Sequence, residues 1–170
     1  RCCGRFAPPS TARRTERAGP SAATVRLAHR TGQGRGRLGH AFVENATSGV
    51  QAVLRSVELA PGDRILITSH TYNAVRLMVL ARCAETGAEP LVVQLPLPAD
   101  SDDIVARLEA ACLPSVRLAI LDHITSPTAL VMPLEPMMAA LRRQGALVLV
   151  DGAHAVGQLP LDLGALDADW

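Results

Sequence analysis

The 170-residue sequence contains no lysine, so that all 17 of its basic residues are arginine. Aromatic residues make up only 2% of the chain although 48% of it is hydrophobic, and we therefore expect a core of Ala, Leu and Val side chains. No apolar run approaches the length that crosses a membrane, and no secretory signal is recognisable. The four cysteines lack the paired C-x-x-C spacing. This argues against a zinc site or a disulfide framework, and we expect a reducing, cytoplasmic location.

The charge of the chain is distributed unevenly. Residues 1–40 hold nine of the 17 arginines and one of the 16 acidic residues, a net charge of +8, whereas residues 41–170 carry −7. Residues 1–39 are rich in Arg, Gly, Pro, Ser, Thr and Ala and have no helical or strand period, so we expect a disordered or non-native segment. A transit peptide, a nucleic-acid-binding arm and an out-of-frame stretch stay open as alternatives. The abrupt change in composition near His40 favours the last, and the scarcity of aromatic residues argues against nucleic-acid binding.

From residue 40 onward, short apolar runs alternate with stretches of helical period. The pattern predicts strands at 40–44, 64–68, 90–95, 117–122 and 146–150, and helices at about 49–59, 73–86, 102–111 and 134–144. Strands that alternate with helices through short connections predict an α/β fold, with a mostly parallel sheet and helices on both faces. We therefore predict one domain over residues 40–170.

The strand predicted at 146–150 ends at Asp151, which is followed by Gly152 and His154. Five consecutive apolar residues are typical of a strand that is buried on both faces of a parallel sheet. Open α/β sheets bind their ligands at the carboxyl ends of such strands. A carboxylate in that place is costly to bury without a cationic partner. Asp151 therefore indicates a positively charged partner, which the strand itself does not identify.

Other polar residues follow strands that are predicted to end at the same edge. Thr47 and Ser48 lie at the start of a helix, where their hydroxyls suit a phosphate group or an ordinary helix cap. Tyr72, the only tyrosine, is suited to stacking on a flat ligand or to partial burial with a bonded hydroxyl. The turn at 45–49 lacks the glycine patterns of dinucleotide and triphosphate sites. These ligands are therefore disfavoured.

A metal site is a further interpretation of the polar residues at this edge. It would gather four side chains that follow the last two predicted strands: Asp122, His123, Asp151 and His154. Their spacing matches no recognised metal-binding pattern, so we predict no metal.

Four segments, in this order along the chain, resemble the class V aminotransferase family: residues 42–53 (FVENATSGVQAV), 67–75 (ITSHTYNAV), 122–128 (DHITSPT) and 150–162 (VDGAHAVGQLPLD). The nearest branch is the isopenicillin N epimerase-like group, with the cysteine desulfurases as relatives. The resemblance covers about residues 40–170. It implies part of the large domain of a fold-type I enzyme that uses pyridoxal 5′-phosphate.

The resemblance also implies which residues hold the two ends of the cofactor. Ala46, Thr47 and Ser48 would bind its phosphate through backbone N–H groups and hydroxyls. Tyr72 would stack on the pyridine ring, and His70 is the alternative because the alignment can shift there.

The remaining roles concern the edge of the cofactor ring. Ser126, or else Thr125, would form a hydrogen bond near the ring hydroxyl. Asp151 would pair with the protonated pyridine nitrogen, and His154 would lie beside the ring. Asp151 and His154 are thus the expected catalytic residues, and the cation that Asp151 requires is the cofactor itself.

The absence of lysine is a departure from the family, whose members bind the cofactor covalently through a lysine that follows this aspartate. We therefore expect a fragment that is inactive alone. The parent enzyme would be a homodimer acting on a small amino-acid substrate by epimerisation, by β-elimination or desulfuration, or by transamination. A non-catalytic remnant or interaction module is the alternative, and an RNA-binding protein that acts through the basic arm is a weaker one.

Overall fold

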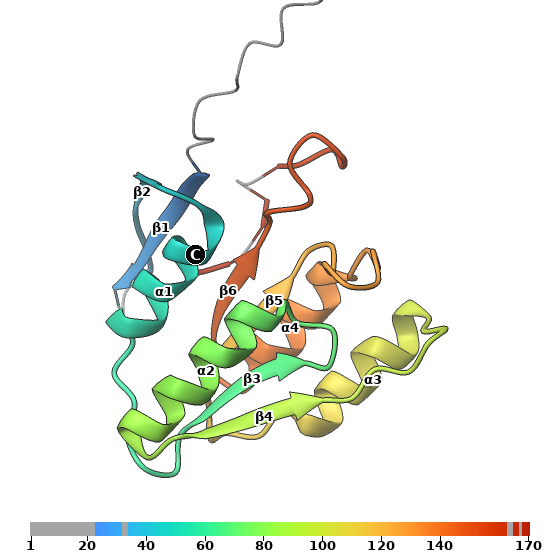
Figure 1. The fold of residues 1–170 in the computed structure, drawn as a ribbon, viewed down its shortest axis with the longest axis horizontal. Helices are drawn as coiled ribbons and strands as arrows, with labels where there is room; N and C mark the ends of the chain where they lie inside the picture. Colours follow the sequence, from blue (N-terminus) through green and yellow to red (C-terminus); the bar gives the residue numbers. More distant parts are fainter. Residues whose placement is uncertain (1–22, 32–33, 163–164, 167) are drawn as a thin grey trace, which may run out of the picture.

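The centre of the fold is a four-stranded sheet in which every neighbouring pair of strands is parallel (Figure 1). The computed structural model describes residues 23–31, 34–162, 165–166 and 168–170. The strand order is β4-β3-β5-β6. The bounds are Arg64–Thr68 for β3, Glu89–Val93 for β4, Val116–Asp122 for β5 and Leu147–Asp151 for β6. The predicted α/β class is confirmed.

Two pairs of helices cover the two faces of this sheet (Figure 1). The helices are α1 (Ala46–Ser56), α2 (Asn73–Thr86), α3 (Ser101–Ala111) and α4 (Leu134–Arg143). Side chains alternate between faces along each strand. Leu118 and Ile120 of β5 therefore pack with α1 and α2, whereas Ala119 and Leu121 pack with α3 and α4. The uninterrupted apolar runs of the sequence fill both layers of the core.

The helix ends follow the capping signals of the sequence. Gly87 ends α2 in the left-handed conformation, with φ of 75°, and its N–H bonds to the carbonyl of Cys83. Asp100 caps α3 by accepting a hydrogen bond of 2.8 Å from the N–H of Asp103. Arg142 and Arg143 lie in the last turn of α4, where a positive charge is favourable. The helix ends lie within about three residues of those predicted.

A hairpin of β1 (Ala23–Thr31) and β2 (Gly34–Val43) precedes the sheet. The strand predicted at 40–44 is the end of β2. The sequence predicted no regular structure over the rest of residues 1–39, and that expectation is wrong for the two described strands. The apolar alternation at 23–27 is short, and the arginine- and glycine-rich stretch after it shows no strand period. Antiparallel pairing still satisfies the backbone groups there, because it does not depend on the side-chain pattern. Residues 1–22 lie outside the described residues, and a non-native origin of the segment stays a prediction.

The outer edge of β6 is covered by the last residues of the chain. Trp170 O accepts a hydrogen bond of 3.0 Å from Val150 N–H, and Asp169 N–H donates one of 2.8 Å to Val148 O. The buried Asp169 carboxylate also accepts from Val148 N–H at 2.8 Å and lies 3.6 Å from Arg142 Nη2. Within the part of the chain that the structure describes, no helix is long and apolar enough to cross a membrane.

We expect Leu121→Ala to lower the free energy of unfolding by about 2–5 kcal/mol, because Leu121 is fully buried between the sheet and α3 and α4. Urea unfolding followed by circular dichroism measures the change. Leu113→Ala is the matched control, since that side chain is 45% exposed, and it should cost under about 1 kcal/mol. Equal losses for the two variants would contradict the packing described.

Candidate functional site

Two carboxylates lie side by side where β5 and β6 end. The parallel register pairs Asp122 directly with Asp151. Side chains alternate between the two faces along a strand, so Asp122 lies on the same face as Leu118 and Ile120 of β5. For the same reason Asp151 lies on the same face as Leu149 of β6. Both carboxylates therefore lie on the side of the sheet that α1 and α2 cover.

Asp122 is the more strongly perturbed of the two carboxyl groups. Burial, and then the negative charge of Asp151, raise its pKa from 3.8 to about 6. Hydrogen bonding from the Thr71 side chain and from the Tyr72 and Asp122 backbone opposes that rise. Asp122 is 5% exposed, and its Oδ2 atom has no hydrogen-bond partner among the described residues. This edge of the sheet therefore favours a proton or a bound cation.

Asp151 is only partly buried, whereas its neighbour Asp122 is buried. Its Oδ1 atom accepts a hydrogen bond of 3.0 Å from the N–H of Ala153, which turns the chain directly after β6. His154 follows in the same turn and is exposed. The backbone N–H of His123 donates to the carbonyl of Asp151 at 2.9 Å, and burial lowers the pKa of the His123 side chain. The two segments that follow β5 and β6 are thus joined through their backbones.

The segment between β3 and α2 carries His70 and Tyr72. His70 is 8% exposed, with Nε2 at 3.0 Å from the carbonyl oxygen of Leu95 and Nδ1 at 3.0 Å from Oγ1 of Thr128. Tyr72 occupies the cap position of α2 and is 43% exposed. The imidazole is therefore fixed between two loops, whereas the phenol lies at the surface.

The loop that follows β5 is folded tightly on itself. Thr125 is 1% exposed; its hydroxyl oxygen accepts a hydrogen bond of 2.8 Å from Leu130 N–H and lies 2.8 Å from Oγ1 of Thr128. Ala129 in the same loop adopts a φ of 53°, a conformation that is costly for a residue other than glycine. Ser126 is exposed. Of the two hydroxyls predicted here, that of Thr125 is used inside the loop and that of Ser126 is accessible.

The amino end of α1 lies at the same edge of the sheet. This helix leads into β3, so its first turn lies toward the carboxyl ends of the strands (Figure 1). The sequence predicted a start near residue 49, but the helix begins at Ala46 because Asn45 Oδ1 accepts a hydrogen bond of 2.8 Å from Ser48 N–H. Thr47 and Ser48 thus lie inside the first turn. The first N–H groups of a helix have no acceptor within it, and they attract anions.

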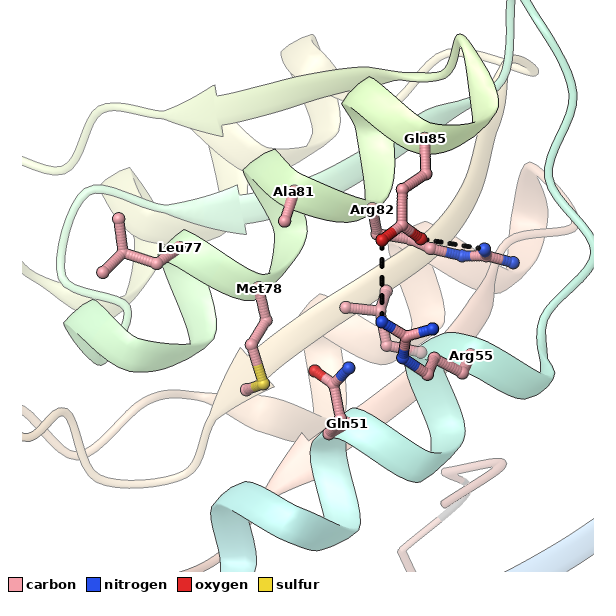
Figure 2. Close-up of a pocket in the computed structure, with 8 residues that line it drawn as sticks. Gln51, Arg55, Leu77, Met78, Ala81, Arg82 and Glu85 are labelled. Atoms are coloured by element: carbon pink, nitrogen blue, oxygen red, sulfur yellow. Dashed lines mark hydrogen bonds and ion pairs between the residues drawn. The ribbon is translucent and has the colours of Figure 1, made fainter.

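A pocket of about 260 Å³ lies elsewhere, between α1 and α2 (Figure 2). Glu85 lies between Arg55 and Arg82 at its rim, at 3.6 and 3.4 Å. None of the predicted site residues lines this pocket. Within the described part of the chain, no group of three or more His, Cys, Asp or Glu side chains is arranged to hold a metal ion.

The structure therefore gathers the predicted residues at one edge, on loops that follow three neighbouring strands and at one helix end. Sequence reasoning gave no cofactor role to two residues that the geometry brings there. The sequence indicates Asp122 only as a candidate metal ligand, although it ends an apolar strand just as Asp151 does. Thr128 lies in the segment DHITSPT, but the sequence predicts no role for it, because its contact with His70 spans 58 residues of sequence.

The family model and the most similar proteins agree on one family. The model of the family described as aminotransferase class-V matches residues 40–170. The chain is 35% identical over 144 residues to putative L-cysteine desulfhydrase 1 of Oryza sativa subsp. japonica, covering 76% of the chain and 30% of that protein. It is 36% identical over 132 residues to isopenicillin N epimerase of Streptomyces clavuligerus, covering 76% and 33%. The chain thus spans about a third of the length of these curated relatives.

Solved structures give the same picture. The chain superposes on a cystine C-S lyase in complex with its product cysteine persulfide with a TM-score of 0.67 and 33% identity, covering 73% of the chain and 34% of that structure. A variant of the same lyase, with glycine covalently linked to its PLP cofactor, matches with the same TM-score and identity, covering 73% of the chain and 33% of that structure.

We expect Asp122→Asn to change how stability depends on pH. Because the folded-state pKa of about 6 exceeds the ordinary 3.8, the folded protein holds a proton that the unfolded chain loses, and stability falls as pH rises from about 4 to about 6. Asparagine removes this loss. The variant should match the unmodified chain near pH 4 and exceed it by about 2–3 kcal/mol above pH 7. Urea unfolding across this pH range measures the difference.

Glu58→Gln is the control for this measurement, because Glu58 is exposed at the opposite edge of the sheet, between α1 and β3. It should shift the pH profile by under about 0.5 kcal/mol. Parallel profiles for Asp122→Asn and the unmodified chain would show that Asp122 does not hold the proton.

Proposed function

The chain belongs to the class-V aminotransferase family, and from this we propose that the carboxyl edge of its sheet forms the cofactor-binding part of an amino-acid-transforming enzyme. Pyridoxal 5′-phosphate is the cofactor, as in the solved lyase variant of the same fold. The observation that carries the proposal is the pair of carboxylates, Asp122 and Asp151, on the side of the sheet where α1 presents its amino end.

The donor and acceptor groups at this edge fit the two charged ends of that cofactor. Among the described residues neither carboxylate is paired with an arginine, and Oδ2 of Asp122 has no partner, so the edge suits the protonated pyridine nitrogen. The first turn of α1 offers N–H groups and two hydroxyls, which suit the phosphate. A flat molecule with a cation at one end and a phosphate at the other therefore matches both sets of groups.

We assign the residues as follows. Asp151, at the mouth of the site, holds the pyridine nitrogen protonated, and the buried Asp122 strengthens the negative potential there. The phosphate binds to the backbone of Ala46 and Thr47 and to the hydroxyls of Thr47 and Ser48.

The ring itself would lie against the loops that follow β3, β5 and β6. We favour His70 for stacking on the ring, because both of its ring nitrogens are engaged in the ring plane and its faces are held in place, with the exposed Tyr72 as the alternative. Ser126 is better placed than Thr125 for the ring hydroxyl, since the Thr125 hydroxyl is engaged inside its loop. His154 would lie beside the ring.

The chemistry that the bound cofactor supplies is the withdrawal of electrons from the Cα of an amino acid. Epimerisation and β-elimination both begin with loss of the Cα proton, so the two activities named among the relatives share this requirement. In this chain, Asp151 supports the chemistry by keeping the ring nitrogen charged, and α1 fixes the other end of the molecule. The sequence has no lysine, the residue to which the family resemblance assigns the covalent link. The proposal for this chain is therefore confined to binding and electrostatics.

A small amino-acid substrate and a homodimer are parts of the same proposal for the whole protein. Two alternatives stay as predictions: a non-catalytic interaction module, and RNA binding through the basic amino-terminal arm.

Asp151→Asn should weaken binding of pyridoxamine 5′-phosphate to the 170-residue chain by about tenfold or more. This probe has the ring nitrogen and phosphate of the cofactor but no aldehyde. The variant loses a charge-assisted hydrogen bond, and such bonds contribute roughly 1.5–3 kcal/mol. Isothermal titration calorimetry measures the affinity.

The control variant is Asp102→Asn, an exposed aspartate in the first turn of α3, on the other face of the sheet, and its affinity should equal that of the unmodified chain. Pyridoxamine without the phosphate should bind more weakly than the phosphorylated probe. An Asp151→Asn chain that binds as tightly as the unmodified one, or an unmodified chain that does not bind the probe, would refute the proposed site.

A further inference from the structure

His70 is connected to two loops and two threonines by one continuous line of hydrogen bonds. The line runs from the N–H of Leu130 to Oγ1 of Thr125 (2.8 Å), to Oγ1 of Thr128 (2.8 Å), to Nδ1 of His70 (3.0 Å), and from Nε2 of His70 to the carbonyl of Leu95 (3.0 Å). We propose that Thr128 is a positioning residue that holds His70 in a single neutral tautomer and a single ring orientation. The proposal rests on the cofactor site proposed above, in which the imidazole of His70 stacks on the cofactor ring.

The direction of each bond follows from its two ends. The carbonyl of Leu95 can only accept, so Nε2 of His70 must carry a hydrogen. The opposite tautomer would place a lone pair against that carbonyl oxygen at 3.0 Å. In the neutral ring Nδ1 is then an acceptor, and the Thr128 hydroxyl must donate to it.

The remaining bonds complete this arrangement. The single hydroxyl hydrogen of Thr128 is used by His70, so the hydroxyl of Thr125 must donate to Thr128. The oxygen of Thr125 still accepts from the N–H of Leu130. Every donor in the line is used once. A doubly protonated His70 would force Thr128 to accept and to turn its own hydrogen toward Thr125, which would displace the hydrogen that Thr125 now donates.

This arrangement has a consequence for the ring. Hydrogen bonds in the plane of an imidazole, one on each nitrogen and from two different loops, prevent the ring from rotating. His70 also precedes Thr71 and Tyr72, which bond to the Asp122 carboxyl. A charged imidazolium at this place would compete with the pyridine nitrogen for the two carboxylates. Thr128 therefore keeps a neutral, immobile ring on the segment whose next two residues bond to Asp122.

The tautomer can be measured without the cofactor. A two-bond ¹H–¹⁵N spectrum of the full chain with ¹⁵N-labelled histidine separates a protonated from an unprotonated ring nitrogen, and the His70→Gln chain identifies the His70 signals. At pH 7.5 we expect Nε2 protonated and Nδ1 unprotonated in the unmodified chain. Any other state, or an average of the two tautomers, would overturn the proposal without the need for a variant.

Two substitutions test the role of the hydroxyl. Thr128→Val keeps the shape of the side chain but removes the hydroxyl, and the His70 signals should move toward the average of two tautomers. Thr128→Ser retains the hydroxyl and should restore the single tautomer. Thr86→Val is the matched control, because the Thr86 hydroxyl bonds to the carbonyl of Arg82 at the far end of α2, and it should leave His70 unchanged. An unaltered tautomer in a folded Thr128→Val chain would overturn the assignment.

Titration with pyridoxamine 5′-phosphate gives the second readout. Thr128→Val should weaken binding about threefold to tenfold, and Thr128→Ser should bind like the unmodified chain. If the unmodified chain shows the expected tautomer but does not bind the probe, the cofactor site fails while the hydrogen-bond line stands. If binding occurs but Thr128→Val changes neither affinity nor tautomer, the role of Thr128 fails and the cofactor site stands.

Discussion

The parallel register of β5 against β6 is the constraint on which the candidate site depends. It pairs Asp122 with Asp151, so that two carboxylates that are 29 positions apart in the sequence become direct neighbours. The apolar residues before each of them fix this register, because a shift of one residue would exchange the side chains that face α1 and α2 with those that face α3 and α4. The packing of the core therefore determines where the charges lie.

Such a pair is unfavourable in the folded chain alone, and the surrounding backbone relieves it only in part. The amino ends of α1 and α2 lie on the same side of the sheet, where their dipoles favour negative charge. Hydrogen bonding from Thr71 and Tyr72 lowers the pKa of Asp122, but burial and Asp151 outweigh it. Keeping two carboxylates in this place lowers the free energy of unfolding of the chain. A cation bound between them would raise it again.

Much of this fold follows from local signals in the sequence. The apolar run at 146–150 predicted a strand that leads into Asp151, where the structure has β6 at Leu147–Asp151, and Gly87 correctly marked the end of α2. What local signals could not give is contact across the chain. The hydrogen bond between His70 and Thr128 depends on how the loops after β3 and β5 pack against each other. The hydrophobic period of the sequence carries no information about that packing. The hairpin of β1 and β2 escaped prediction for a related reason, since its pairing uses backbone groups and its sequence alternates apolar with polar residues only over 23–27.

The two ends of the proposed site also define the orientation of a ligand. A phosphate group would be repelled by Asp122 and Asp151 and attracted by the first turn of α1, whereas a protonated ring nitrogen has the opposite preferences. A neutral His70 adds no competing charge at this edge of the sheet, and its bonds to Leu95 and Thr128 keep its ring from turning. A compact metal ion would need only the carboxylates and would gain nothing from a fixed aromatic face. The combination of a negative pole, a positive pole and an immobile flat side chain therefore favours an extended, planar, zwitterionic molecule in one orientation.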